Sequence, residues 1–258
     1  MSNLNSSKSI AIIYNSDASL YRFRVGLIRA LRDRGVTVYA IAPPGRFVKS
    51  LEEAGAVFTP WYVEGRGINP ISELRSLFTL HRILRRLRPT VTHFFTVKPN
   101  IYGAVAAKLT GISAIIASVT GLGYILVNPS WRAMMVRRWV MPLYHLCFTL
   151  SDAITFQNKS DWDALIGGRP RIEKKAHYMP GGSGVDLSYF NPSQTDLESL
   201  MRLRRELSIP ENATVAVFIG RALWEKGVAE YAACARIIRL KHPQVYFLFV
   251  GPTEHGVS

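Results

Sequence analysis

The sequence is poor in acidic residues, and these are unevenly distributed. It holds 18 acidic and 32 basic residues, which gives a formal charge of +14 at pH 7. Between Glu73 and Asp152 there is no acidic residue, although ten basic residues occur there. A charge bias of this kind indicates a face that meets an anionic surface or an anionic substrate.

Cysteines are few, and signal-like segments and repeats are absent. Cys147 and Cys234 lie far apart without metal-ligand spacing, which favours reduced thiols and argues against a disulfide scaffold or a cysteine metal site. Residues 1–8 lack the regions of a signal peptide, so we expect a cytoplasmic protein. No low-complexity tract is visible, and the hydrophobic content of 48% is typical of a globular chain.

Short apolar runs alternate with helical patterns, as in parallel βαβ units. The predicted helices include 20–34, 71–87 and 100–109. The predicted strands are 10–14, 36–42, 57–62, 91–95, 114–119 and 153–156, with 176–179 as a candidate for one more. These elements make a Rossmann-like first domain.

A loop-rich passage over 167–196 then precedes a new set of elements. We expect a helix to about residue 207, a strand at 215–219, a helix at 228–240 and a strand at 245–250. The predicted fold is therefore α/β, with a complete Rossmann-like domain over 1–192 and the start of a second one over 193–258.

Four loops follow strands of the first domain and should ring one crevice, because ligands bind at the carboxyl ends of parallel strands. Asp17 could accept a proton from a sugar hydroxyl, and a helix cap is the competing role. Lys98, between a strand and a helix, is placed for an anion. His93 suits proton transfer by its ordinary pKa, but its place within a strand favours a packed, hydrogen-bonded core histidine instead. The residues expected at the donor and acceptor crevice are Ser16, Asn100, Thr120, Gly121, Gly123 and Gly184.

Gly220–Gly227 joins the strand at 215–219 to the following helix. Arg221 leaves the carboxyl end of the strand, and Lys226 stands near the helix N-terminus, where backbone N–H groups and the helix dipole favour anions. The stretch lacks the Gly-Lys-Ser/Thr of a P-loop. It predicts a diphosphate site, with a solvated surface loop as the alternative.

Residues 131–148 combine aromatic and basic side chains with no acid. This pattern favours a helix at a membrane surface, where aromatics lie at the headgroup level and cations face anionic lipid. An ordinary core helix would explain the apolar half. The residues expected to contact the membrane are Trp131, Arg132, Arg137, Arg138 and Trp139. Nucleic acid is not an expected partner, because no binding motif accompanies the charge.

Taken together, these stretches resemble the retaining family 4 glycosyltransferases of GT-B architecture, in the bacterial branch that builds capsule, O-antigen and lipid-linked glycans. The resemblance covers essentially the whole chain. Its marks are Ser19–Arg24, Tyr39–Pro44, Lys98–Gly103, Thr120–Tyr124, Phe156–Asn158, Pro180–Asp186 with Phe190 and Pro192, and Gly220–Gly227.

The resemblance implies transfer of a hexose or N-acetylhexosamine from a nucleotide sugar, usually a UDP-sugar, to a polyprenyl-diphosphate-linked or other glycan acceptor. It places the donor diphosphate on Arg221 and Lys226, and it implies no metal or cofactor. It also implies a peripheral protein at the inner face of the cytoplasmic membrane. The family's paired glutamates do not occur before Ser258, which suggests a C-terminally truncated member. The alternatives are an inactive, membrane-peripheral binding fragment and a nucleotide-sugar epimerase.

Overall fold

The computed structural model describes residues 8–64, 69–122 and 130–252, apart from the side chains of residues 132, 133 and 225. The chain divides into two compact units, Met1–Asp186 and Leu187–Ser258. The sequence places the domain boundary after residue 192, within the linking passage. Each unit is described below by itself.

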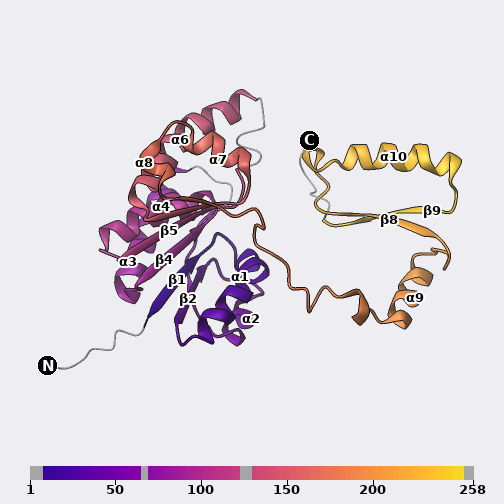
Figure 1. Cartoon of the computed structure of the whole chain (residues 1–258), viewed down its shortest axis with the longest axis horizontal. Helices are drawn as coiled ribbons and strands as arrows, with labels where there is room; N and C mark the ends of the chain where they lie inside the picture. The colour runs from indigo at the N-terminus through magenta and orange to yellow at the C-terminus, as the bar shows by residue number, and fades with distance from the viewer. Residues whose placement is uncertain (1–7, 65–68, 123–129, 253–258) are drawn as a thin grey trace. The chain divides into compact units, whose positions relative to one another are not determined.

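The first unit is built on a seven-stranded parallel sheet (Figure 1) with the order β3-β2-β1-β4-β5-β6-β7. Every neighbouring pair in this sheet is parallel, so all the strands end at the same edge. The α/β class is confirmed. The strands are β1 (Ser9–Ile13), β2 (Thr37–Ala42), β3 (Ala56–Pro60), β4 (Val91–Phe95), β5 (Ala114–Val119), β6 (Ala153–Phe156) and β7 (Ala176–Tyr178).

Helices cover both faces of this sheet (Figure 1). On one face α1 and α2 bury Leu20, Ile28 and Leu51 against the sheet. On the other face α3, α4, α6 and α7 enclose a larger core that includes Phe94 and Phe148. The helices of this unit are α1 (Asp17–Arg32), α2 (Val48–Glu53), α3 (Pro70–Leu87), α4 (Val97–Leu109), α6 (Trp131–Leu150), α7 (Lys159–Ile166) and α8 (Pro170–Glu173).

Helix ends follow local chemistry. The side chain of Asn69 accepts a hydrogen bond from the Ile71 N–H and Pro70 begins α3, as the sequence predicts. Helix α1 begins at Asp17, three residues earlier than predicted, because Ser16 acts as its N-cap and accepts from the Ser19 N–H at 3.4 Å. Helix α4 begins at Val97 rather than residue 100. Pro99 does not prevent this, because the first helical turn needs no intrahelical N–H donor.

The second unit holds β8 (Thr214–Ile219) and β9 (Val245–Val250) as a parallel pair. It also contains α9 (Leu197–Glu206), capped by Asp196, and α10 (Val228–Lys241). Tyr231 of α10 donates to backbone carbonyl groups of both strands, at 3.0 Å in each case. Among the described residues of this unit, the buried hydrophobic residues are Ile209 and Ala213, which are 9% and 6% exposed.

Candidate functional site

Asp17 joins two of the loops at the carboxyl edge of the sheet. Its Oδ2 accepts from the Phe47 N–H at 2.8 Å, and its Oδ1 accepts from the Ala18 N–H at 2.7 Å. A side chain at Gly45 would lie 2.6 Å from Asp17 Oδ1, so the loop after β2 passes directly over the carboxylate. Asp17 is 8% exposed. Asp17 is thus the first residue of α1 and not its cap, which is Ser16, and its carboxylate holds the loop after β2.

The loop after β5 is anchored by a buried carboxylate that sequence reasoning did not identify. Asp161, in the first turn of α7, is buried and accepts from the Leu122 N–H at 3.1 Å and from Asn158 Nδ2 at 2.6 Å. Thr120 and Gly121 precede this anchor at the rim. Gly121 has φ of 140°, a conformation that favours glycine, and open space around its α-carbon. Gly123 lies outside the described residues.

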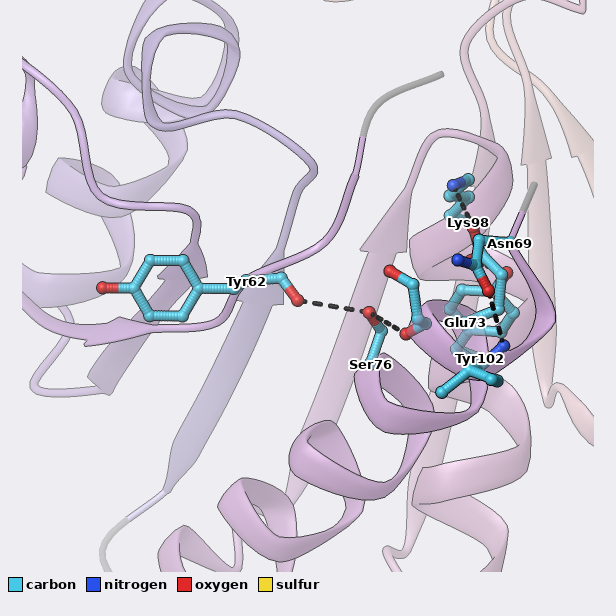
Figure 2. Close-up of polar contacts among 8 residues, drawn as sticks. Tyr62, Asn69, Glu73, Ser76, Lys98 and Tyr102 are labelled. Carbon is cyan, nitrogen blue, oxygen red and sulfur yellow. Dashed lines mark hydrogen bonds and ion pairs between the residues drawn. The ribbon is translucent and has the colours of Figure 1, made fainter. Parts of the chain in front are cut away.

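Lys98 lies within the first turn of α4, which corrects its predicted place before the helix. Its Nζ is 2.5 Å from Glu73 Oε1, and the Tyr102 hydroxyl donates to Glu73 Oε2 (Figure 2). Glu73 belongs to the first turn of α3, 25 positions away in the sequence. Its carboxylate neutralises the Lys98 ammonium, so Lys98 is not an isolated cation awaiting an anion.

Asn100 and Gly184 lie in different environments. Asn100 is fully buried in α4, where its Nδ2 donates to the Ser118 carbonyl at 2.8 Å, so it supports the rim from below instead of lining a loop. Gly184 is exposed, with φ of 69°. Its loop follows β7 and is tied to the end of β6 by a bond of 3.2 Å from Gln157 Nε2 to Ser183 Oγ.

His93 lies in β4, in a polar row across three strands. Its Nε2 shares a hydrogen bond of 2.7 Å with Ser118 Oγ, which in turn is 2.6 Å from Thr155 Oγ1. Burial, with a further contribution from the Arg24 cation, lowers the pKa of His93 to about 3. The imidazole is therefore neutral near pH 7 and a poor proton acceptor, as the packed-histidine interpretation predicts.

Arg24 is a buried cation to which sequence reasoning gave no role. Its guanidinium lies 4.1 Å from the Phe95 ring centroid, and its Nε and Nη2 have no hydrogen-bond partner among the described residues. Burial lowers the pKa of Arg24, against an opposing effect of Tyr14. Leu20, Arg24 and Ile28 recur every four residues, and this spacing could have revealed that Arg24 faces the core.

The three candidates for proton transfer do not form one constellation. Asp17 and His93 lie on the α1 side of the sheet, where Phe95 packs against His93. Lys98 belongs to α4, which packs on the opposite face. The chain therefore brings together Lys98 with Glu73, and His93 with Ser118, but not the three predicted residues.

Helix α6 has one buried side and one exposed apolar side. Tyr144, Cys147 and Phe148 face the core, whereas Trp131 and Trp139 are 67% and 70% exposed. Arg138 is exposed and Arg137 is half-buried, while the side chain of Arg132 lies outside the described part. No helix in the described ranges is long and apolar enough to cross a bilayer.

A groove of about 1130 Å³ runs beside α3 and the end of β3. Its lining combines apolar side chains, including Trp61, Val63 and Phe78, with arginines that include Arg82 and Arg86. The sequence did not predict this hollow, because it depends on how α3 packs beside the edge strand.

In the second unit, the Gly220–Gly227 stretch forms a compact turn between β8 and α10. The Gly220 N–H donates to the Val250 carbonyl at 2.9 Å, which fixes the start of the turn. A short 3₁₀ helix, Trp224–Lys226, precedes Gly227, whose φ of 81° starts α10. The side chains of Arg221 and Lys226 are exposed. An anion could therefore reach both cations.

The sequence and fold can now be compared with those of known proteins. Residues 9–158 match the family described as glycosyl transferase 4-like. The chain belongs to this family. The predicted family resemblance is confirmed.

Two curated relatives in this comparison act on lipid-linked sugars, by their names. One is the N,N'-diacetylbacillosaminyl-diphospho-undecaprenol alpha-1,3-N-acetylgalactosaminyltransferase of Campylobacter jejuni, 27% identical over 96% of this chain and 65% of its own length. The other is a UDP-Gal:alpha-D-GlcNAc-diphosphoundecaprenol alpha-1,3-galactosyltransferase of Escherichia coli, 25% identical over 73% of this chain and 47% of its own length. The chain thus spans less than two thirds of the length of these relatives.

The fold also matches solved structures. HepE of Anabaena, solved with UDP and glucose, superposes with a TM-score of 0.69 at 16% identity, over 96% of this chain and 62% of HepE. At this identity the likeness concerns the fold, and it confirms the predicted GT-B-like class.

Proposed function

We propose that this chain belongs to an enzyme that transfers a hexose or N-acetylhexosamine from a UDP-sugar to a polyprenyl-diphosphate-linked glycan, with retention of configuration. The observation that carries the proposal is the 27% identity, over 96% of the chain, with a transferase named for a diphospho-undecaprenol substrate. In this proposal the first unit binds the acceptor, and the Gly220–Gly227 turn binds the donor diphosphate.

The turn offers the chemistry that a departing diphosphate needs. As the bond between the sugar's anomeric carbon and the diphosphate oxygen breaks, negative charge grows on that oxygen. Arg221 and Lys226 are exposed cations beside the start of α10, and cations held near a helix N-terminus stabilise charge where it develops. Binding of the diphosphate by these two side chains is the step that they contribute.

The acceptor proton requires a destination. The acceptor hydroxyl forms the new bond to the anomeric carbon, and its proton passes to an oxygen of the departing diphosphate. This route needs no protein base, metal or cofactor. The pKa of about 3 for His93 supports this route, because an imidazole with so low a pKa is a weak base at neutral pH.

Association with the inner face of the cytoplasmic membrane is part of the proposal. The outer side of α6 exposes Trp131, Trp139 and Met134, with Arg138 exposed on the same helix. Aromatic and basic side chains together suit the headgroup region of an anionic bilayer. This position would give the protein access to a membrane-embedded acceptor.

The test of the donor site is calorimetric titration of the 258-residue protein with UDP. We expect Arg221→Met and Lys226→Met each to weaken UDP binding by about tenfold or more, since hydrogen bonds to charged groups are worth roughly 1.5 to 3 kcal/mol. Arg239→Met, in the last turn of α10, is the matched control and should leave UDP affinity unchanged. Equal UDP affinity in all four proteins would contradict the proposed donor site.

The test of transfer is release of UDP from a panel of UDP-sugars in the presence of lipid-linked acceptors. We expect one donor to give UDP together with an elongated lipid-linked product, whose anomeric configuration is then read by NMR. A product with inverted configuration would refute the retaining mechanism. UDP binding and vesicle binding without any turnover would instead support the inactive binding fragment considered above.

A further inference from the structure

A carboxylate, an ammonium group and a phenol meet where α3 and α4 begin (Figure 2). Glu73 receives the Lys98 Nζ at 2.5 Å on Oε1 and the Tyr102 hydroxyl on Oε2. The Lys98 and Glu73 side chains are only 16% and 17% exposed. The pair differs from the solvated ion pairs of the surface, yet part of each side chain is open to a ligand.

The fold holds this cluster at the carboxyl edge of the sheet. Helices α3 and α4 follow β3 and β4, so both begin at the edge where the strands end. The N-terminal half of α3 is fixed by a hydrogen bond from Trp61 Nε1 to the Ser76 carbonyl at 2.9 Å. Ser76 Oγ also donates to the Tyr62 carbonyl at 3.2 Å (Figure 2). Glu73 is therefore positioned by its backbone as well as by its partners.

The charge balance of the cluster points to a neutral ligand. Glu73 is the last acidic residue before Asp152 in a strongly basic stretch, and it cancels the charge of Lys98. Because the charges of Glu73 and Lys98 cancel, the pair attracts a diphosphate only weakly. It keeps hydrogen-bonding capacity, because each oxygen of the Glu73 carboxylate can accept more than one bond.

The Tyr102 hydroxyl donates its one proton to Glu73 Oε2, so its oxygen is available to a ligand only as an acceptor. Burial and the adjacent Glu73 carboxylate raise the pKa of its phenol. Oxygen acceptors held in a partly buried cluster whose charges cancel match the O–H donors of a sugar.

We propose that Glu73, Lys98 and Tyr102 form a subsite that binds hydroxyl groups of the acceptor sugar, with Glu73 accepting from a sugar O–H. This inference rests on the proposed function, and it assigns to Glu73 a specificity role that neither sequence pattern nor charge predicted.

The experiment compares two ligands on the 258-residue protein by calorimetry. One is a short-chain prenyl diphosphate that carries N-acetylglucosamine, and the other is the same prenyl diphosphate without the sugar. We expect wild type to prefer the sugar-bearing ligand, and we expect Glu73→Gln to reduce this preference by about tenfold. The sugarless ligand should bind the variant at least as tightly as wild type, because Lys98 loses its neutralising partner.

Two further variants separate a sugar-binding role from a structural one. Tyr102→Phe keeps the ring and should reduce the preference by a few-fold, roughly the value of one neutral hydrogen bond. Glu53→Gln is the matched control, because Glu53 forms an exposed pair with Lys49 at 3.9 Å, and it should leave the preference unchanged. Circular dichroism establishes that each variant is folded.

The outcomes are distinguishable. An unchanged preference in folded Glu73→Gln, or an equal loss of affinity for both ligands, would overturn the subsite and leave a structural ion pair. If wild type bound both ligands equally, the subsite would fall while the proposed acceptor class survived. If wild type bound neither ligand, the proposed acceptor class would fall with it.

Discussion

The low pKa of His93 predicts that the protein loses stability in mild acid. Its pKa in the folded protein is about 3, against an ordinary value of 6.5. When the pH falls below 6.5, the unfolded chain takes up a proton on this side chain and the folded chain does not. The free energy of unfolding therefore decreases as the pH falls through 6.5, and the loss continues until the pH nears the folded pKa.

The magnitude follows from these two pKa values. Between pH 7.5 and pH 5.5 the unfolded imidazole becomes about nine-tenths protonated, which costs the folded state about 1.4 kcal/mol. His93→Gln removes this titration and retains a side chain that can hydrogen-bond to Ser118. We expect the variant to lose about 1.4 kcal/mol less than wild type over this pH range, measured by urea unfolding at each pH.

Comparing variant with wild type cancels the contributions of the other titrating groups. His177→Gln, at an exposed position of β7, is the control and should follow wild type. The same pH dependence of unfolding in wild type and His93→Gln would refute the conclusion that the folded protein keeps His93 neutral. A transfer rate that falls below pH 6.5 in wild type alone would restore His93 as a general base.

Three further predictions test the packing of particular residues. A β-carbon at Gly103 would lie 2.2 Å from the Phe94 ring, so Gly103→Ala should reduce the free energy of unfolding by about 1 to 3 kcal/mol. Gly26→Ala, in the exposed middle of α1 with open space around it, should stabilise by up to about 1 kcal/mol in the same urea assay. For the cysteines, Ellman's reagent should label exposed Cys234 in the native protein and reach Cys147 only on unfolding, because burial raises the pKa of Cys147 to about 12. Rapid native labelling of both thiols would contradict this packing.

Local signals made much of the fold predictable. Asn69 and Pro70 mark the start of α3 because cap and first-turn preferences depend only on nearby backbone groups. The parallel sheet follows from short apolar runs that alternate with helices. The predicted start of α4 was wrong. Its N-cap position is Thr96, which has φ of 70° and makes no capping bond through its side chain.

The candidate site was less predictable because its chemistry depends on partners that lie far apart in the sequence. Lys98 looks like a lone cation in the sequence, and only packing of α3 against α4 brings Glu73 to it. Likewise, the environment of His93 is set by Arg24 from α1 and Ser118 from β5. Sequence reasoning located the rim correctly but could not assign charge states there.

The placement of cations in the first unit bears on what each part binds. The Lys98 charge is cancelled at the rim, whereas Arg75, Arg82 and Arg86 line the groove beside α3. Arg138 is exposed on α6, and α3 and α6 both pack against α4 on the same side of the sheet. The positive excess of the basic stretch thus lies on α3 and α6 and not at the rim where Glu73 and Lys98 meet. This separation agrees with the proposals that α6 meets an anionic membrane and that the rim binds a neutral sugar.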